Sequence, residues 1–237
     1  MNTLNRILFT IVILFGCSAQ LVTADESSLV KIKQQVKAIQ WHSIQDTGNW
    51  GYTIESRLDN GKLQQRIQRY SPVRPAGKQW ELLEQDNKKP SKTTLNEYAK
   101  IQVEIQSEDT PVDTKDIEIV PAITLKYLKT EGQYRIYSFK PYLPFFEEDV
   151  NKVFEGKLYF DVEQEQVKII EIKASESFSP AFSIKVKEFS MSIDIDKAEQ
   201  TLHVTKITSE KSGSVFLFGK FQEKSVKLFS DFVRHNE

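Results

Sequence analysis

The sequence predicts a mainly β protein with some α structure: a single curled antiparallel sheet of about 11 strands, an unclosed barrel, with two or three helices on one side. From residue 154 onward, segments rich in Val, Ile, Phe and Tyr follow one another, each bounded by Gly, Asp, Asn, Ser or Pro. No helical period separates them, which favours an antiparallel meander over βαβ units. The expected strands are Phe154–Asp161, Gln166–Ala174, Phe182–Ile195, Thr201–Ser209, Ser214–Phe221 and Ser225–Val233.

The apolar alternation changes phase within three of these segments. In Phe182–Ile195 the apolar residues occupy even positions up to Val186 and odd positions from Phe189 onward. A strand keeps one core face across such a change only if a residue is inserted, so a β-bulge is expected near residues 187–188. Similar changes at 167–170 and 204–207 predict two more bulges. Because bulges bend strands, they favour a strongly curled sheet; a flatter sheet with some apolar residues in solvent is the alternative.

The first 24 residues are typical of a secretory signal. Arg6 precedes an apolar run over residues 7–15, and Val22-Thr23-Ala24 resembles a cleavage site. The run is too short for a transmembrane helix, which needs about 20 apolar residues. We expect export and a periplasmic chain, residues 25–237, that folds as a single domain. The alternative is an outer-membrane lipoprotein, because Leu14-Phe15-Gly16-Cys17 resembles a lipobox in which Cys17 would be lipidated.

Composition excludes several classes of partner. Cys17 is the only cysteine, so residues 25–237 contain no disulfide and no thiol. The net charge is −1 for the whole chain and −2 without Arg6, a balance that argues against nucleic acid and against strong electrostatic membrane binding. We expect no cofactor, no membrane span after the signal, and a monomer.

Between the signal and the meander, helices and short strands are expected. Apolar residues at three- and four-residue spacing predict an amphipathic helix over residues 25–40. Asn60-Gly61 predicts the turn of a hairpin over residues 50–70, and residues 80–85 form a short strand.

A second helix is expected to begin after Pro90-Ser91, with Ser91 as its cap. It either continues past Lys100 or gives way to a strand there. Glu131-Gly132 then marks a further hairpin before the meander.

One series of motifs resembles a family of uncharacterised Gram-negative envelope proteins. Its members usually have Asp-Pro in place of Ser71-Pro72, and Gly-x-x-Pro-Thr in place of residues 87–91. That family is similar in layout to the periplasmic lipoprotein-carrier fold, an unclosed antiparallel barrel with helices over its mouth. The resemblance implies a fold and transfers no functional residue. It is based on Pro72, Arg74-Pro75, Gly77, Trp80, Leu82-Leu83, Pro90-Ser91 and Phe178-Ser-Pro-Ala181.

The sequence contains no pattern typical of catalysis or metal binding. A Gly-x-Ser-x-Gly motif is absent, and His42, His203 and His235 lack the spacing of a metal site. His203 is expected to be exposed, because its strand neighbours point to the opposite face. Asp194 and Asp196 alternate with isoleucines, as on a solvated strand face. We therefore expect no enzyme, no catalytic residue and no metal.

The expected function is the binding or carriage of an apolar or amphipathic ligand such as a lipid, an acyl chain or an acylated peptide. A protein-interaction module with a filled interior is the alternative, and a hydrolase is a distant third. Arg66, Arg69, Arg74 and Lys78 form a basic cluster that either pairs with nearby acids or binds an anion or headgroup. The candidate ligand contacts are Trp50, Tyr52, Arg69, Trp80, Phe216 and Phe218.

Overall fold

The computed structural model describes residues 28–39, 41, 49–75, 77–108 and 118–235, and the side chains of 103–108 are not included. The expected signal segment, Cys17 and His42 lie outside the described residues. No helix in the described part of the chain is long and apolar enough to cross a membrane.

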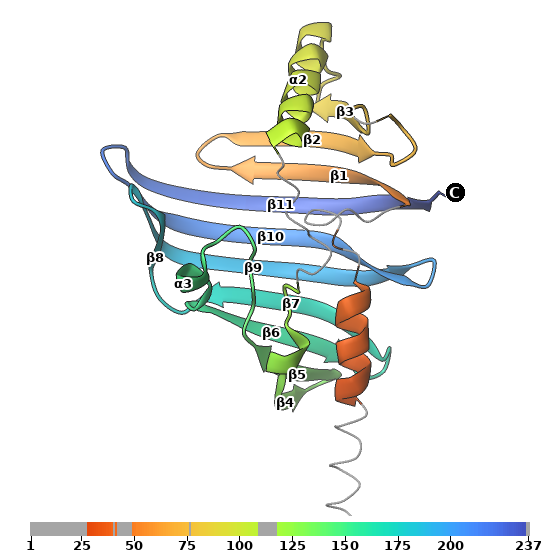
Figure 1. Ribbon diagram of the computed structural model, residues 1–237, viewed down its shortest axis with the longest axis vertical. Coiled ribbons are helices and arrows are strands. Elements are labelled where there is room, and N and C mark those ends of the chain that lie inside the picture. The colour runs from red at the N-terminus through yellow and green to blue at the C-terminus, as the bar shows by residue number, and fades with distance from the viewer. Residues whose placement is uncertain (1–27, 40, 42–48, 76, 109–117, 236–237) are drawn as a thin grey trace, which may run out of the picture.

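All the described strands belong to one antiparallel sheet (Figure 1), as the sequence predicted. The strand order is β3-β2-β1-β11-β10-β9-β7-β6-β5-β4, and β8 pairs with β9 beside β7. The C-terminal strands therefore form the expected meander, and the N-terminal hairpin extends the sheet by pairing with the last strand. The strands are β1 (Trp50–Asp59), β2 (Leu63–Tyr70), β3 (Trp80–Gln85), β4 (Lys126–Glu131), β5 (Tyr134–Phe139), β6 (Phe154–Asp161), β7 (Gln166–Ala174), β8 (Phe178–Ala181), β9 (Ile184–Ala198), β10 (Thr201–Val215) and β11 (Gly219–Arg234).

The three predicted bulges are confirmed by the register of the strands. Ser212 pairs with Glu188 and Gly213 with Val186, so Lys187 is the extra residue in β9. In the same way, Thr205 is extra in β10 opposite β9, and Lys168 is extra in β7 opposite β6. Each bulge coincides with a change of apolar phase, because the inserted residue keeps the apolar side chains on one face.

The predicted strand Ser214–Phe221 is wrong, because this segment contains the turn between β10 and β11. Leu217 and Gly219 have positive φ angles of 68° and 89°, and the Phe218 amide donates to the Val215 carbonyl at 3.1 Å. Phe216 and Phe218 are therefore turn residues with 69% and 87% of their surface exposed. They do not belong to a strand buried on both faces.

Helices lie on the concave side of the sheet. The N-terminal helix covers residues 28–38, and α2 (Lys92–Glu108), η2 (Ala122–Thr124) and α3 (Glu148–Asn151) follow. Ser91 caps α2 as predicted, since its hydroxyl accepts from the Thr94 amide at 3.1 Å. α2 continues as a helix past Lys100, so the alternative of a strand beginning there is wrong.

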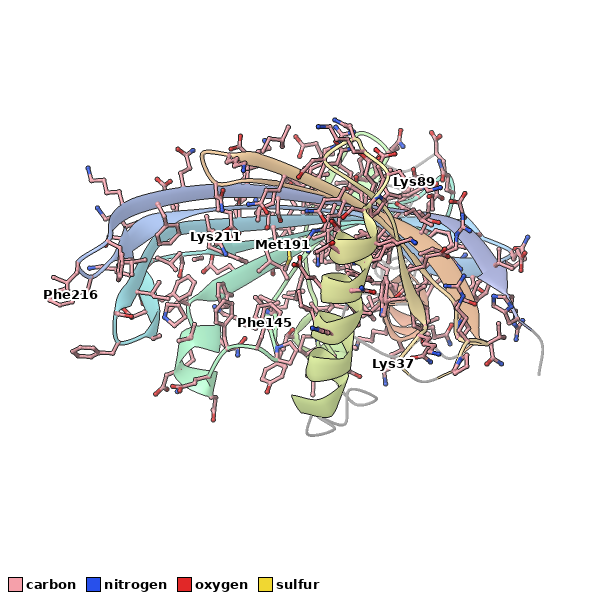
Figure 2. The ribbon with its side chains drawn as sticks, turned by 90° about the horizontal axis from the view of Figure 1, so that it is seen from above. Lys37, Lys89, Phe145, Met191, Lys211 and Phe216 are labelled. Atoms are coloured by element: carbon pink, nitrogen blue, oxygen red, sulfur yellow. The ribbon has the colours of Figure 1, made fainter. Side chains whose placement is uncertain are left out.

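The sheet is an arch that does not close (Figure 2). β3 and β4 are its two free edges, so the expected unclosed barrel is confirmed. The N-terminal helix fills one half of the concave side: Ile32 is fully buried in a core that includes Leu158, Ile170 and Ile193. In Figure 1 the other half, toward the β10–β11 turn, is faced by the short helix α3.

Candidate functional site

The concave face has a cavity in the half that the N-terminal helix does not fill. Its volume is about 630 Å³, and its walls come from β8, β9, β10, β11 and the segment before α3. This volume is within the range of roughly 300–1,000 Å³ that is usual for ligand pockets. Its apolar lining includes Phe145, Phe146, Phe178, Phe189, Met191 and Phe221.

Four phenylalanines at this end of the concave face form one cluster, the aromatic floor: Phe146, Phe154, Phe178 and Phe189. Ring centroids lie 5.2 Å apart for Phe154 and Phe178, 5.4 Å for Phe146 and Phe178, and 5.4 Å for Phe154 and Phe189. Edge-to-face and tilted contacts at these distances are favourable for aromatic pairs. Three of the four rings line the cavity, the exception being Phe154.

The bulge at Lys187 determines which side chains of β9 reach this site. Val186 precedes the bulge and Phe189 follows it, yet both line the cavity. In a regular strand, residues at odd separation point to opposite faces, so the insertion is what places both on the concave side.

The buried side chain of Asn151 positions the segment that carries Phe145 and Phe146. Its Oδ1 accepts from the Leu143 amide at 2.7 Å, and its Nδ2 donates to the carbonyls of Leu143 at 3.1 Å and Phe146 at 2.9 Å. Sequence reasoning missed Asn151. A lone asparagine after an acidic run resembles any surface residue, and no sequence pattern indicates its burial.

Polar residues line the side of the cavity formed by β10 and β11. Lys211 and Glu223 form an ion pair at 2.8 Å, and the hydroxyls of Ser209 and Ser225 lie 2.9 Å apart. In the register of the sheet, Lys211 is opposite Phe189 and Ser209 is opposite Met191. The β10–β11 side of the cavity thus supplies its charged and hydroxyl groups, beside the apolar side chains of Val215 and Phe221, whereas the β8–β9 side is mainly apolar.

The six candidate ligand contacts do not converge on this cavity, and none of them lines it. The rings of Tyr52 and Trp80 contact each other, with centroids 5.8 Å apart. Tyr52 belongs to the hydrophobic core at the N-terminal end of β1, and Trp80 packs against that core. Trp50 is buried there and packs edge-on against His203 at 4.5 Å. Arg69 is exposed and is paired in register with Glu81 on β3.

Phe216 and Phe218 lie closer to the cavity but outside it. They follow Val215, which lines the cavity, and they form an exposed apolar tip with Phe182 and Leu217. The Phe216 amide donates to the Ser183 carbonyl at 2.8 Å, which joins the β8–β9 and β10–β11 turns.

The expectation that His203 is exposed is wrong: its side chain is fully buried. Leu202 and Val204 are buried too, so both faces of β10 are covered at this point. Phe232 stacks on the imidazole at a centroid distance of 4.4 Å. Burial lowers the pKa of His203 below its ordinary value of 6.5, and a hydrogen bond involving the Ala198 backbone opposes this shift.

A second hollow, of about 770 Å³, lies over β4–β7, and six of its twelve lining residues are charged. Lys157 is opposite Glu171, and Glu155 is opposite Lys173. Opposite charges facing each other across strands are typical of a solvated sheet surface. Within the described residues no cluster of His, Cys, Asp and Glu side chains could hold a metal ion. The concave cavity is therefore the stronger candidate site.

Comparisons with known proteins do not identify a family. No family model matches the chain, and no curated protein matches it. A solved structure of an isomerase-inactive variant of GphF DH1 is 9% identical over 79% of this chain and 76% of that chain, with a TM-score of 0.16. A TM-score this low carries no argument about fold or function.

Proposed function

We propose that the protein is an exported envelope protein that binds an apolar or amphipathic ligand, a lipid or an acyl chain, in the concave cavity without catalysis. The observation that carries this proposal is the open cavity of about 630 Å³ against a floor of phenylalanines. Phe178 and Val186 belong to the hydrophobic core and also line this space, together with Phe145, which is 61% exposed. The lipoprotein-carrier layout suggested by the sequence motifs supports the same reading.

The energetics are adequate for a carrier. Each buried methylene contributes about 0.8 kcal/mol, so a chain that buries ten of them gains about 8 kcal/mol before the costs of association are subtracted. Micromolar affinity corresponds to about −8 kcal/mol. We expect dissociation constants that are micromolar or larger, which suit a ligand that must be released.

Export supports a location in the periplasm, and lipidation at Cys17 is the alternative that would place the protein on the outer membrane. In both cases the concave cavity would be presented to envelope lipids. We expect a monomer, with the sheet edges β3 and β4 left unpaired.

The test is a binding titration with a fluorescent fatty-acyl probe. We expect saturable micromolar binding to the wild-type chain. Met191→Trp adds bulk to the cavity wall and should weaken binding at least tenfold. Leu63→Trp adds the same bulk at a residue that is 63% exposed on β2, and it should leave binding unchanged. Absence of saturable binding to a panel of acyl lipids, or equal binding by the two variants, would contradict the proposal.

A protein-interaction module is the second candidate, favoured by the apolar tip of Phe182, Phe216, Leu217 and Phe218, each at least 69% exposed. Under that reading, Phe216→Ser combined with Phe218→Ser would release a partner that is crosslinked to the wild-type protein in the envelope. The same variant would retain acyl-probe binding if the concave cavity is the ligand site.

A further inference from the structure

A row of polar residues crosses three strands on the concave face. Ser56 on β1 pairs in register with Lys227 on β11 and with Arg66 on β2. Side chains that are directly opposite in antiparallel strands project on the same face. Lys227 is also opposite Ile207, which packs against the core. The three residues, named here the basic row, therefore share the concave face with the cavity.

The basic row has an uncompensated positive charge. Among the described residues, neither Lys227 nor Arg66 is in an ion pair. Two acids on these strands already have partners: Glu223 pairs with Lys211, and Glu55 pairs with Arg57. Two cations flanking a hydroxyl can satisfy an anion that enters from the open side.

Lys227 is accessible to solvent and yet partly dehydrated. Its side chain is exposed, but the surrounding wall of the concave face removes part of the water around the ammonium and lowers the pKa of Lys227. An ammonium that has already lost some of its hydration needs less desolvation to contact an anion. Arg66 adds a planar fork of donors that suits a carboxylate or a phosphate.

The basic row lies within reach of a ligand in the cavity. Ser209 lines the cavity and contacts Ser225 on β11, and Lys227 is two residues further along β11 on the same face. Two residues of a strand span about 7 Å. An extended chain lying on the aromatic floor can therefore place its polar end beside Lys227.

We propose that the ligand is an anionic amphiphile, whose acyl chain lies on the aromatic floor and whose carboxylate or phosphate is held by Lys227 and Arg66, with the Ser56 hydroxyl as a further donor. This inference rests on the proposed function and narrows it to one class of ligand. The apolar side of the cavity explains affinity for the chain, and the basic row explains selectivity for the headgroup.

The test uses probes that share a dodecyl chain and differ only at the headgroup: dodecanoate, dodecyl phosphate, dodecanol and dodecyltrimethylammonium, each below its micelle concentration. We expect the two anions to bind the wild-type chain at least tenfold more tightly than the alcohol and the cation. Lys227→Gln combined with Arg66→Gln should remove this preference and leave dodecanol binding unchanged.

The matched control is Lys224→Gln combined with Arg69→Gln. These residues lie on the same two strands at positions whose side chains project from the opposite face, and the control should retain the preference for anions. Comparison of the melting temperatures of the two double variants separates a lost headgroup contact from a lost fold. A further titration with inorganic phosphate tests whether the row binds a lipid headgroup or a free anion. Phosphate alone should not compete with dodecanol for the protein.

The outcomes separate the two proposals. If dodecanol binds the wild-type chain as tightly as dodecanoate, the anionic inference is overturned and the acyl-binding proposal is retained. If the preference for anions survives in the Lys227→Gln, Arg66→Gln variant, the headgroup lies elsewhere and the inference is overturned. If inorganic phosphate binds as tightly as dodecyl phosphate, the row is an anion site that does not use the cavity. If no probe binds, the proposed function itself is overturned.

Discussion

Deletion of Lys187 tests whether the bulge in β9 determines which side chains form the cavity. Lys187 is the residue without a counterpart between the Ser212–Glu188 and Gly213–Val186 pairs. Without it, the part of β9 before Glu188 has to turn over relative to the rest of the strand. Val186, now 4% exposed, would then leave the concave face.

The magnitude follows from the apolar surface that would be lost. Full burial of a Val or Ile side chain is worth about 1.5–3 kcal/mol. Val186 is buried and Ile184 is half-buried, so turning both to solvent should lower the free energy of unfolding by about 3 kcal/mol. This is a large fraction of the roughly 5–15 kcal/mol that stabilises a typical domain.

The assay is equilibrium unfolding in urea, combined with titration of the acyl probe. Lys187→Ser is the matched control, because it keeps the inserted residue and should change stability by less than about 0.5 kcal/mol. We expect the deletion to weaken probe binding as well as stability, since Val186 lines the cavity. A deletion variant that is as stable as the wild type and still binds the probe would refute the role assigned to the bulge.

Two further perturbations test the positioning of the site and the buried imidazole. Asn151→Ala removes the partners of the Leu143 amide at 2.7 Å and of the Phe146 carbonyl at 2.9 Å, so urea unfolding should show a loss of about 2–4 kcal/mol. Probe binding should also weaken, because Phe146 loses its support, and unchanged binding would exclude that role. Burial lowers the pKa of His203 in the folded state, so only the unfolded chain takes up a proton as the pH falls below about 6.5, and stability should decline there. His203→Leu should flatten this decline between about pH 7.5 and pH 5.5, and an equally steep decline in the variant would assign the effect to another group.

The curled sheet could be predicted because it depends on short-range patterns. Each change of apolar phase in the sequence corresponds to one inserted residue in the register, at Lys168, Lys187 and Thr205. The Asn60-Gly61 turn is also a local signal, and Gly61 has the positive φ angle of 96° that a tight turn requires. Patterns formed by residues close together in the chain can be recognised in a single sequence.

The errors occur where a local pattern has two physical solutions. Val215-Phe216-Leu217-Phe218 has the composition of a strand, but the positive φ angles at Leu217 and Gly219 close a hairpin there. His203 alternates with apolar neighbours as an exposed residue would, yet Phe232 and Trp50 cover it. Aromatic side chains from β1 and β11 bury the imidazole, and the sequence around His203 does not indicate their approach.

The candidate site could not be predicted because it is assembled by pairings between distant segments. Lys227, Ser56 and Arg66 form a row only because β1 pairs with both β2 and β11. The basic cluster expected around Trp80 is divided by the sheet: Arg74 pairs with Glu81 at 2.7 Å, whereas Arg66 lies on the concave face. Strand pairing, rather than proximity in the sequence, determines which cations share a face.

One half of the concave side is filled by the N-terminal helix, and the other half contains the cavity. The reason is that the helices are much shorter than the strands they lie on. The β9 strand has 15 residues and extends about 50 Å. The N-terminal helix at residues 28–38 extends only about 16 Å, and α3 has four residues, about 6 Å. The longest helix, α2, has 17 residues but contacts β3 at the edge of the sheet, so the helices leave part of the concave face uncovered. In the uncovered part, Phe154 and Phe178 are buried in the core, whereas Phe146 and Phe189 are half-buried and Phe145 is 61% exposed. This remaining apolar surface is in contact with water unless a ligand lies on it. This mismatch between a long sheet and short helices is the physical basis for expecting a bound acyl chain.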